Sequence, residues 1–201
     1  MQSMYSEKET LIFEGVIHLL ERGISPYTMK VSDIAQNASI GKGTIYEYFE
    51  SKEEVIAKGL EYYAARMITD VRKDLARMDS FEEQFNRLLD LIEQHFAKHQ
   101  NSTDLFDILG KLALYYKEKL PDRKLEQQFF QAFDRIVDPL IDTACKERWL
   151  PEDNTPYYNR TVIKGALSGF KEYILFYENH ENVTIEEARK TAYQMVRKAL
   201  K

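Results

Sequence analysis

Apolar residues recur at three- and four-residue spacing along most of the chain, which is the pattern of amphipathic helices. Over residues 31–38 the apolar stripe consists of Val31, Ile34, Ala35 and Ala38. The next three residues break the period, and we expect Gly41 to make a sharp turn because glycine tolerates backbone angles closed to other residues. A second short helix is predicted over residues 42–49, with Ile45 and Phe49 facing back on the first. The stretch therefore predicts two short helices joined by a tight turn.

The rest of the chain continues the helical pattern, without the extended alternation that is typical of strands. Three Ser/Thr-x-x-Glu sequences have the spacing of capping boxes, in which two side chains satisfy free backbone N–H groups at the start of a helix. These sequences begin at Ser6, Ser51 and Thr184. The remaining predicted helices cover residues 6–21, 51–78, 81–98, 104–119, 122–148, 156–177 and 184–200. The chain is therefore predicted to be all-α, with about nine helices.

The outward face of the helix over residues 42–49 carries an unusual set of groups. With Ile45 and Phe49 pointing inward, the outward residues are Lys42, Gly43, Thr44, Tyr46 and Tyr48. Their ammonium, hydroxyl and phenol groups hydrogen-bond phosphates and base edges, and a glycine lets the backbone approach closely. Two helices, a tight turn and such a face indicate a helix-turn-helix unit, whose second helix enters the DNA major groove. The alternative is a plain helical hairpin with a solvated face.

The stretch 34–55, IAQNASIGKGTIYEYFESKEEV, resembles the DNA-binding domain of the TetR family of bacterial transcriptional regulators. The resemblance runs from about Leu11 to Leu60, and its most specific parts are Gly41 to Tyr46, Tyr48-Phe49 and Ser51 to Glu53. It implies a helix-turn-helix DNA-binding domain over residues 1–52, followed over residues 53–201 by a helical domain that binds an effector and dimerises. The protein would then be a repressor that releases its operator DNA when a small molecule binds.

The resemblance also implies which residues contact DNA. The candidates are Lys30, Ser32, Lys42, Gly43, Thr44, Tyr46, Tyr48 and Lys52. The family commonly has a threonine before the first of the two short helices, where Met29-Lys30 stand in this chain. Ser32 or Lys30 would then replace that phosphate contact, and Lys52 would hold a phosphate at the start of the next helix.

The charge of the chain does not favour non-specific DNA binding. The formal net charge is −5, and residues 1–52 carry five Lys/Arg against seven Asp/Glu. A basic patch is the usual electrostatic footprint of a DNA-binding protein, so the DNA hypothesis rests on local lysines and on helix N-termini. A second hypothesis therefore stays open, namely a helical protein that binds a ligand or a protein partner and no longer binds DNA.

A run of small residues, Gly165-Ala166-Leu167-Ser168-Gly169, lies inside the predicted helix 156–177. Glycine inside a helix costs about 1 kcal/mol relative to alanine, and a close approach by another helix would explain two of them. The family resemblance implies a homodimer through the last two helices, with candidate interface residues Gly165, Ser168, Gly169 and Met195. The alternative is close packing within one chain.

Aromatic residues are frequent in the predicted helices between residues 81 and 177. Aromatics at helical spacing are most often core residues, but pockets between helices are lined in the same way. The resemblance places an inducer pocket among these helices, and we expect an apolar or aromatic effector. The pocket candidates are Phe85, Phe96, Phe106, Leu109, Tyr116, Phe129, Phe133 and Tyr173.

The sequence does not favour an enzyme, a cofactor or a metal site, since it has no Gly-rich phosphate loop, nucleophile elbow or paired-acid motif. His95 and His99 have the spacing of a two-histidine metal pair, but no acid follows as in the metalloprotease pattern, so a solvated pair is expected. The single cysteine, Cys145, and the polar N-terminus favour a cytoplasmic protein. No apolar run approaches the length of a membrane span.

Overall fold

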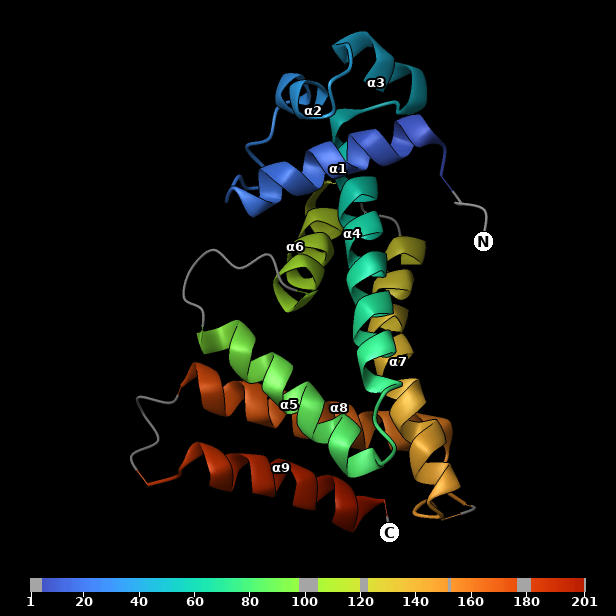
Figure 1. Ribbon diagram of the computed structural model, residues 1–201, viewed down its shortest axis with the longest axis vertical. Coiled ribbons are helices and arrows are strands. Elements are labelled where there is room, and N and C mark those ends of the chain that lie inside the picture. The colour runs from blue at the N-terminus through green and yellow to red at the C-terminus, as the bar shows by residue number, and fades with distance from the viewer. Residues whose placement is uncertain (1–4, 98–104, 120–122, 152, 177–181, 201) are drawn as a thin grey trace. The chain divides into compact units, whose positions relative to one another are not determined.

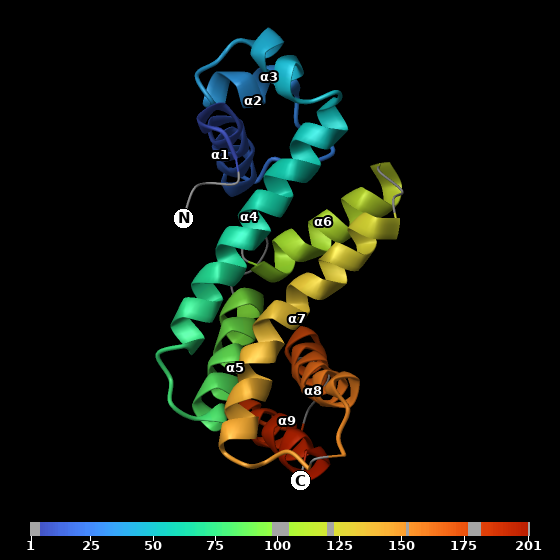
Figure 2. The same ribbon diagram turned by 90° about the vertical axis from the view of Figure 1, so that its right-hand side faces the viewer.

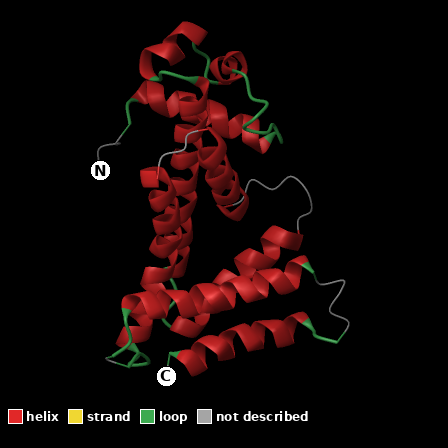
Figure 3. Ribbon diagram, turned by 180° about the vertical axis from the view of Figure 1, so that it is seen from behind, coloured by secondary structure: helices red, strands yellow, loops and turns green. Residues whose placement is uncertain are grey.

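The computed structural model describes residues 5–97, 105–119, 123–151, 153–176 and 182–200. For residues 95–97, 105–109, 113, 116, 123–130 and 132 this description covers the backbone only. All regular structure within these ranges is helical (Figures 1 and 3). The helices are α1 (Glu7–Glu21), α2 (Val31–Asn37), α3 (Lys42–Tyr48), α4 (Lys52–Leu75), α5 (Phe81–Ala97), α6 (Leu105–Lys119), α7 (Arg123–Lys146), α8 (Pro156–Leu175) and α9 (Ile185–Ala199). The predicted all-α fold is confirmed. None of these helices is both long and apolar enough to cross a membrane.

Two of the three predicted capping boxes form completely. Ser6 and Glu9 start α1, and Thr184 and Glu187 start α9, each with both reciprocal bonds. At α4 only half of the box forms, because Ser51 Oγ accepts from the Glu54 N–H at 3.1 Å while the Glu54 carboxylate accepts from the N–H of Glu50.

A complete capping box that was not predicted starts α5. Ser80 Oγ accepts from the Glu83 N–H at 3.2 Å, and the Glu83 carboxylate accepts from the Ser80 N–H at 3.1 Å. The Ser-x-x-Glu spacing was present in the sequence, so this helix start could have been recognised from it.

The chain forms two compact units, and neither is continuous in sequence. The first contains Met1–Thr69 and Gln100–Ala132, and the second contains Asp70–His99 and Phe133–Lys201. The three divisions between the units fall within α4, between residues 99 and 100, and within α7. The predicted boundary between a DNA-binding domain (residues 1–52) and an effector-binding and dimerisation domain (residues 53–201) is a functional division, and it stays a prediction.

In the first unit, α2 and α3 lie beside each other over α1 (Figures 1 and 2). Helices α2 and α4 can pack closely on α1 because each of the two contacts contains a glycine. A Cβ added to Gly15 of α1 would lie 2.9 Å from the carbonyl oxygen of Ile34, and one added to Gly59 of α4 would lie 2.8 Å from the Cβ of Val16. No side chain fits at either distance. The backbones of α2 and α4 therefore approach α1 more closely than a larger residue at these positions would permit.

In the second unit, aromatic rings from three parts of the chain form a core cluster. Phe81 and Phe85 of α5 stack with ring centroids 5.9 Å apart, and Trp149, which follows α7, lies 5.0 Å from Phe81. Tyr193 of α9 lies 6.0 Å from Phe85 and 6.2 Å from Trp149. The segment after α7 is therefore tied to α5 and α9.

Candidate nucleic-acid interface

The turn between α2 and α3 has a left-handed residue, but it is not the one predicted. Gly41 has φ −71° and ψ 144° and is the N-cap of α3, a conformation open to any residue. The positive φ lies at Ser39, with φ 56°. The prediction that Gly41 makes the sharp turn is therefore wrong, because the chain reverses two residues earlier and Gly41 only leads into the helix.

The burial pattern of α3 agrees with the predicted inward and outward faces. Ile45 is fully buried and Phe49, the C-cap, is 5% exposed. Lys42 and Gly43 are exposed, Thr44 is half-buried, and Tyr46 and Tyr48 are 48% and 42% exposed. A tyrosine usually buries much of its ring, so two neighbouring tyrosines in solvent are a notable feature of this helix.

The other three DNA-contact candidates lie at the starts of α2 and α4. Lys30 is the exposed N-cap of α2, and its side chain makes no capping bond. The exposed Ser32 donates a hydrogen bond from Oγ to Asp33 Oδ1 at 3.1 Å. The half-buried Lys52 donates from Nζ to the carbonyl oxygen of Tyr27 at 3.4 Å. Lys52 therefore contacts the loop before α2 in this structure.

Glu47 of α3 is also exposed, although it is not among the predicted DNA-contact residues. Donors and phenols are the groups expected on a DNA-binding face, and a carboxylate does not fit that expectation because it repels phosphates. The helical position of Glu47, two residues after the buried Ile45, was the signal that could have identified it.

A tyrosine of α6 contacts the loop between α1 and α2 within the first unit. Tyr115 is 1% exposed, and its ring centroid lies 5.5 Å from that of Tyr27. Burial, and then the nearby carboxylate of Glu53, raise the pKa of Tyr115. Lys119 Nζ lies 6.0 Å from the Tyr27 ring, within cation–π distance. Helix α6 therefore packs against the loop that leads into α2.

Three of the eight pocket candidates have described side chains, and these differ in their surroundings. Phe85 is fully buried in the aromatic cluster of the second unit. Tyr173 is 9% exposed and donates from its hydroxyl to the Val183 carbonyl oxygen at 2.8 Å. Phe133 is half-buried, with Lys164 Nζ 5.8 Å from its ring centroid. The side chains of Phe96, Phe106, Leu109, Tyr116 and Phe129 lie outside the described residues, as do those of His95 and His99.

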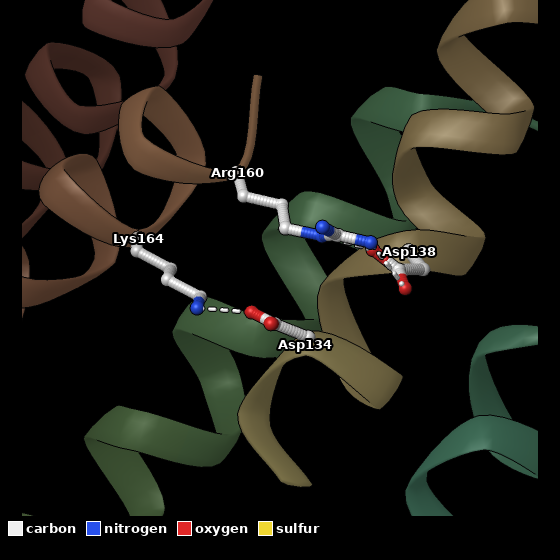
Figure 4. Close-up of polar contacts among 4 residues, drawn as sticks. All are labelled: Asp134, Asp138, Arg160 and Lys164. Carbon is white, nitrogen blue, oxygen red and sulfur yellow. Dashed lines mark hydrogen bonds and ion pairs between the residues drawn. The ribbon is translucent and has the colours of Figure 1, made fainter. Parts of the chain in front are cut away.

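Two ion pairs join α7 to α8 in the second unit (Figure 4). Arg160 donates from its Nε to one oxygen of Asp138 at 2.7 Å and from a terminal nitrogen to the other oxygen at 3.0 Å. Lys164, one turn further along α8, pairs with Asp134 of α7. Because each cation already has a carboxylate partner, these two residues do not form a free site for an anion.

The predicted dimer residues lie on an exposed face of α8 and on α9. Gly165, Ser168 and Gly169 are exposed, and a Cβ added at either glycine would have no other atom within 4 Å. Met195 of α9 is 51% exposed. Within the described part of the chain no helix packs on these glycines, which disfavours the alternative that they serve close packing inside one chain.

Comparisons with known proteins give a consistent family for this arrangement. Residues 19–58 match the family model described as bacterial regulatory proteins, tetR family. The chain is 29% identical over 144 residues to the HTH-type transcriptional regulator YuxN of Bacillus subtilis, a match that spans 70% of this chain but only 47% of YuxN. It is also 24% identical over 190 residues to the HTH-type transcriptional regulator YvdT of Bacillus subtilis, covering 92% of both chains.

The fold is similar to that of FadR, a transcriptional regulator from Bacillus subtilis solved in complex with stearoyl-CoA, with a TM-score of 0.53. That match has 17% sequence identity and covers 95% of this chain and 97% of FadR. The helix-turn-helix geometry, the family match and the two regulator relatives agree with one another. The chain is therefore similar to the TetR family of bacterial transcriptional regulators, whose model matches its residues 19–58.

Proposed function

We propose that this protein is a homodimeric repressor that binds operator DNA through α3 and releases it when a small apolar or aromatic effector binds. The observation that carries the proposal is the exposed surface of α3 around the buried Ile45, where a lysine, a glycine backbone and two tyrosines are exposed together. A helix of this composition suits the major groove, because its hydroxyl and ammonium groups donate to phosphates and base edges.

The acidic balance of residues 1–52 bears on how this binding would work. Non-specific affinity scales with the number of phosphates that lysines and arginines neutralise, and five cations against seven acids leave little net attraction. We therefore expect weak binding to arbitrary duplexes and a specific affinity that depends on contacts made at the correct sequence.

The exposed small-residue face of α8 supports the proposed dimer. Tyr157, near the start of α8, is 78% exposed, and Leu175 and Phe176 at its end are 52% and 51% exposed. A face with exposed apolar residues at both ends and two glycines between them fits the same face of a second copy, since an interface about a two-fold axis uses one patch twice. Two copies would present two α3 helices to two half-sites about 34–36 Å apart, or a multiple of this distance.

The effector is proposed from the aromatic composition of the helices after α4 and from the relative that binds stearoyl-CoA. An apolar molecule would bind among such helices mainly by burial of its surface. To change DNA occupancy from 99:1 to 1:99, it would have to prefer the released state by about 5.5 kcal/mol.

The test is a fluorescence-polarisation titration of the purified protein against the DNA upstream of its own gene and against a scrambled duplex, at two salt concentrations. A preference of about 10³-fold or more for the upstream duplex would support the proposal. Lys42→Ala should weaken binding and lower the slope of log affinity against log salt by about one phosphate contact. Lys73→Ala is the matched control, because Lys73 is an exposed lysine on α4 that is paired with Asp70.

Equal and feeble binding to both duplexes would be followed by selection from a random-sequence pool. If no sequence were enriched, the proposal would be overturned in favour of a helical ligand-binding or partner-binding protein that no longer binds DNA.

A further inference from the structure

The line of α3 that points furthest from the core is formed by Gly43 and Glu47. Successive residues of an α-helix are rotated by about 100°, so both residues lie about 160° around the helix from the buried Ile45, one on each side of the opposite pole. Thr44 and Tyr46 lie about 100° from Ile45 and therefore occupy the flanks of the face. If α3 enters a groove with its outer face, Gly43 and Glu47 reach deepest and the two flanking hydroxyls face the walls.

The surroundings of Glu47 leave its carboxylate available. Its side chain is exposed and makes no hydrogen bond or ion pair with any of the described residues. One turn earlier on the same line, Gly43 has no atom within 4 Å of the position that a Cβ would occupy. An open space therefore adjoins the carboxylate, and a base edge could enter it without displacing a side chain.

We propose that Glu47 is a specificity-determining residue that reads a cytosine in each operator half-site by accepting a hydrogen bond from the N4 amino group. This inference rests on the proposed function, since it requires α3 in the major groove. A carboxylate only accepts hydrogen bonds, and the major-groove edges offer two donors, cytosine N4 and adenine N6. Adenine also presents the acceptor N7 beside N6, which repels a carboxylate, so cytosine is the base that fits.

The negative charge of Glu47 explains why such a contact would discriminate strongly. A carboxylate at the pole of α3 is repelled by phosphates along any duplex, which lowers the affinity for all sequences alike. Only a correctly placed cytosine amino group offsets this repulsion. Glu47 therefore weakens non-specific binding and raises the ratio of the affinity for the correct site to the affinity for other sites. This agrees with the acidic balance of residues 1–52.

The experiment is selection from a random duplex pool with the full-length wild type, Glu47→Ala, Glu47→Gln and the control Glu50→Gln. Glu50 is an exposed acid just beyond α3, so its substitution removes the same charge without touching the pole of the helix. The wild type should enrich cytosine at one fixed position in each half-site. Glu47→Ala should lose that preference by about 10- to 100-fold. Glu47→Gln should move it to adenine, since an amide pairs with adenine N6 and N7.

Glu50→Gln should keep the wild-type motif. Circular dichroism melting of each variant would verify that it is folded, which we expect because both positions are exposed. Identical base preferences at every position in the wild type and both Glu47 variants would overturn the role of Glu47 while leaving the repressor intact. Failure of the wild type to enrich any sequence would instead overturn the proposed function together with this inference.

Discussion

Ser39 and Gly41 lie two residues apart in the turn of the helix-turn-helix, and each has a backbone conformation in which the other residue type would be favoured. Ser39 has φ 56°, which a residue with a Cβ adopts at a cost of about 1–2 kcal/mol. Gly41 is the N-cap of α3 with extended backbone angles and no side chain to accept from a free N–H, although serine is favoured at that position. The turn would therefore be more stable if the two residues were exchanged, with glycine at position 39 and serine at position 41.

We expect Ser39→Gly to raise the free energy of unfolding by roughly 0.5–1 kcal/mol, because it removes the left-handed strain. Gly41→Ser should add a few tenths of a kcal/mol, because its hydroxyl can cap α3. Thermal and urea unfolding followed by circular dichroism would measure both effects. Ser39→Ala is the matched control and should give no gain, since alanine retains the strained φ.

Alanine at two glycines should have opposite effects on stability. Gly15→Ala would place a methyl group 2.9 Å from the Ile34 carbonyl oxygen and should destabilise the protein by about 1–3 kcal/mol. Gly43→Ala meets no atom and should stabilise α3 by up to about 1 kcal/mol. If the backbone at Gly43 approaches DNA, Gly43→Ala should nevertheless bind the operator more weakly, at least tenfold in a polarisation titration. Unchanged affinity would argue against that approach.

The exposed face of α8 gives a prediction about the oligomeric state. Gly169→Leu should leave the helical content unchanged, because the space above Gly169 is open, and should convert the proposed dimer to a monomer in sedimentation or light scattering. Gly110→Leu is the matched control, since Gly110 of α6 is equally open. A Gly169→Leu protein that stays dimeric would place the interface elsewhere.

The Arg160–Asp138 pair should contribute measurably to stability, whereas a more exposed pair should not. Its two hydrogen bonds and its side-chain exposures of 36% and 42% favour a coupling of about 0.5–1 kcal/mol in a double-mutant cycle with Arg160→Gln and Asp138→Asn. The Lys73–Asp70 pair, with exposures of 69% and 64%, should give about 0.3 kcal/mol or less. Added salt should reduce the first value.

The capping carboxylate of Glu187 predicts a pH dependence. Hydrogen bonds from the backbone and then the side chain of Thr184 lower its pKa below the ordinary value of 4.5. A carboxyl with a lowered folded-state pKa contributes stability above its unfolded pKa and loses it as the pH falls through the folded value. The difference in melting temperature between the wild type and Glu187→Ala should thus be largest near pH 7 and shrink below about pH 4.5. Glu186→Ala, which removes an acid without this capping role, should show a weaker dependence.

Much of the fold could be predicted because helical periodicity and capping are local properties of the sequence. The inward positions of Ile45 and Phe49 follow directly from their spacing. The residue that carries the left-handed turn could not be found in this way, because glycine is only the usual choice for that conformation and in this chain Ser39 adopts it. The contact between Tyr27 and Tyr115 was likewise unpredictable, since the two residues are far apart in sequence and no periodic pattern connects distant segments.

The glycines at the contacts of α1 with α2 and with α4 have a mechanical consequence. At Gly15 the Ile34 carbonyl oxygen of α2 leaves no room for a Cβ, and at Gly59 the side chain of Val16 fills the space that a Cβ would occupy. Such interfaces have no spare volume, so α1 cannot slide or rotate between its neighbours without a steric clash. Helices α1 and α2 and the first turns of α4 should consequently move as one rigid body. A ligand-driven change would then act on the position of the recognition helix and leave its shape unaltered.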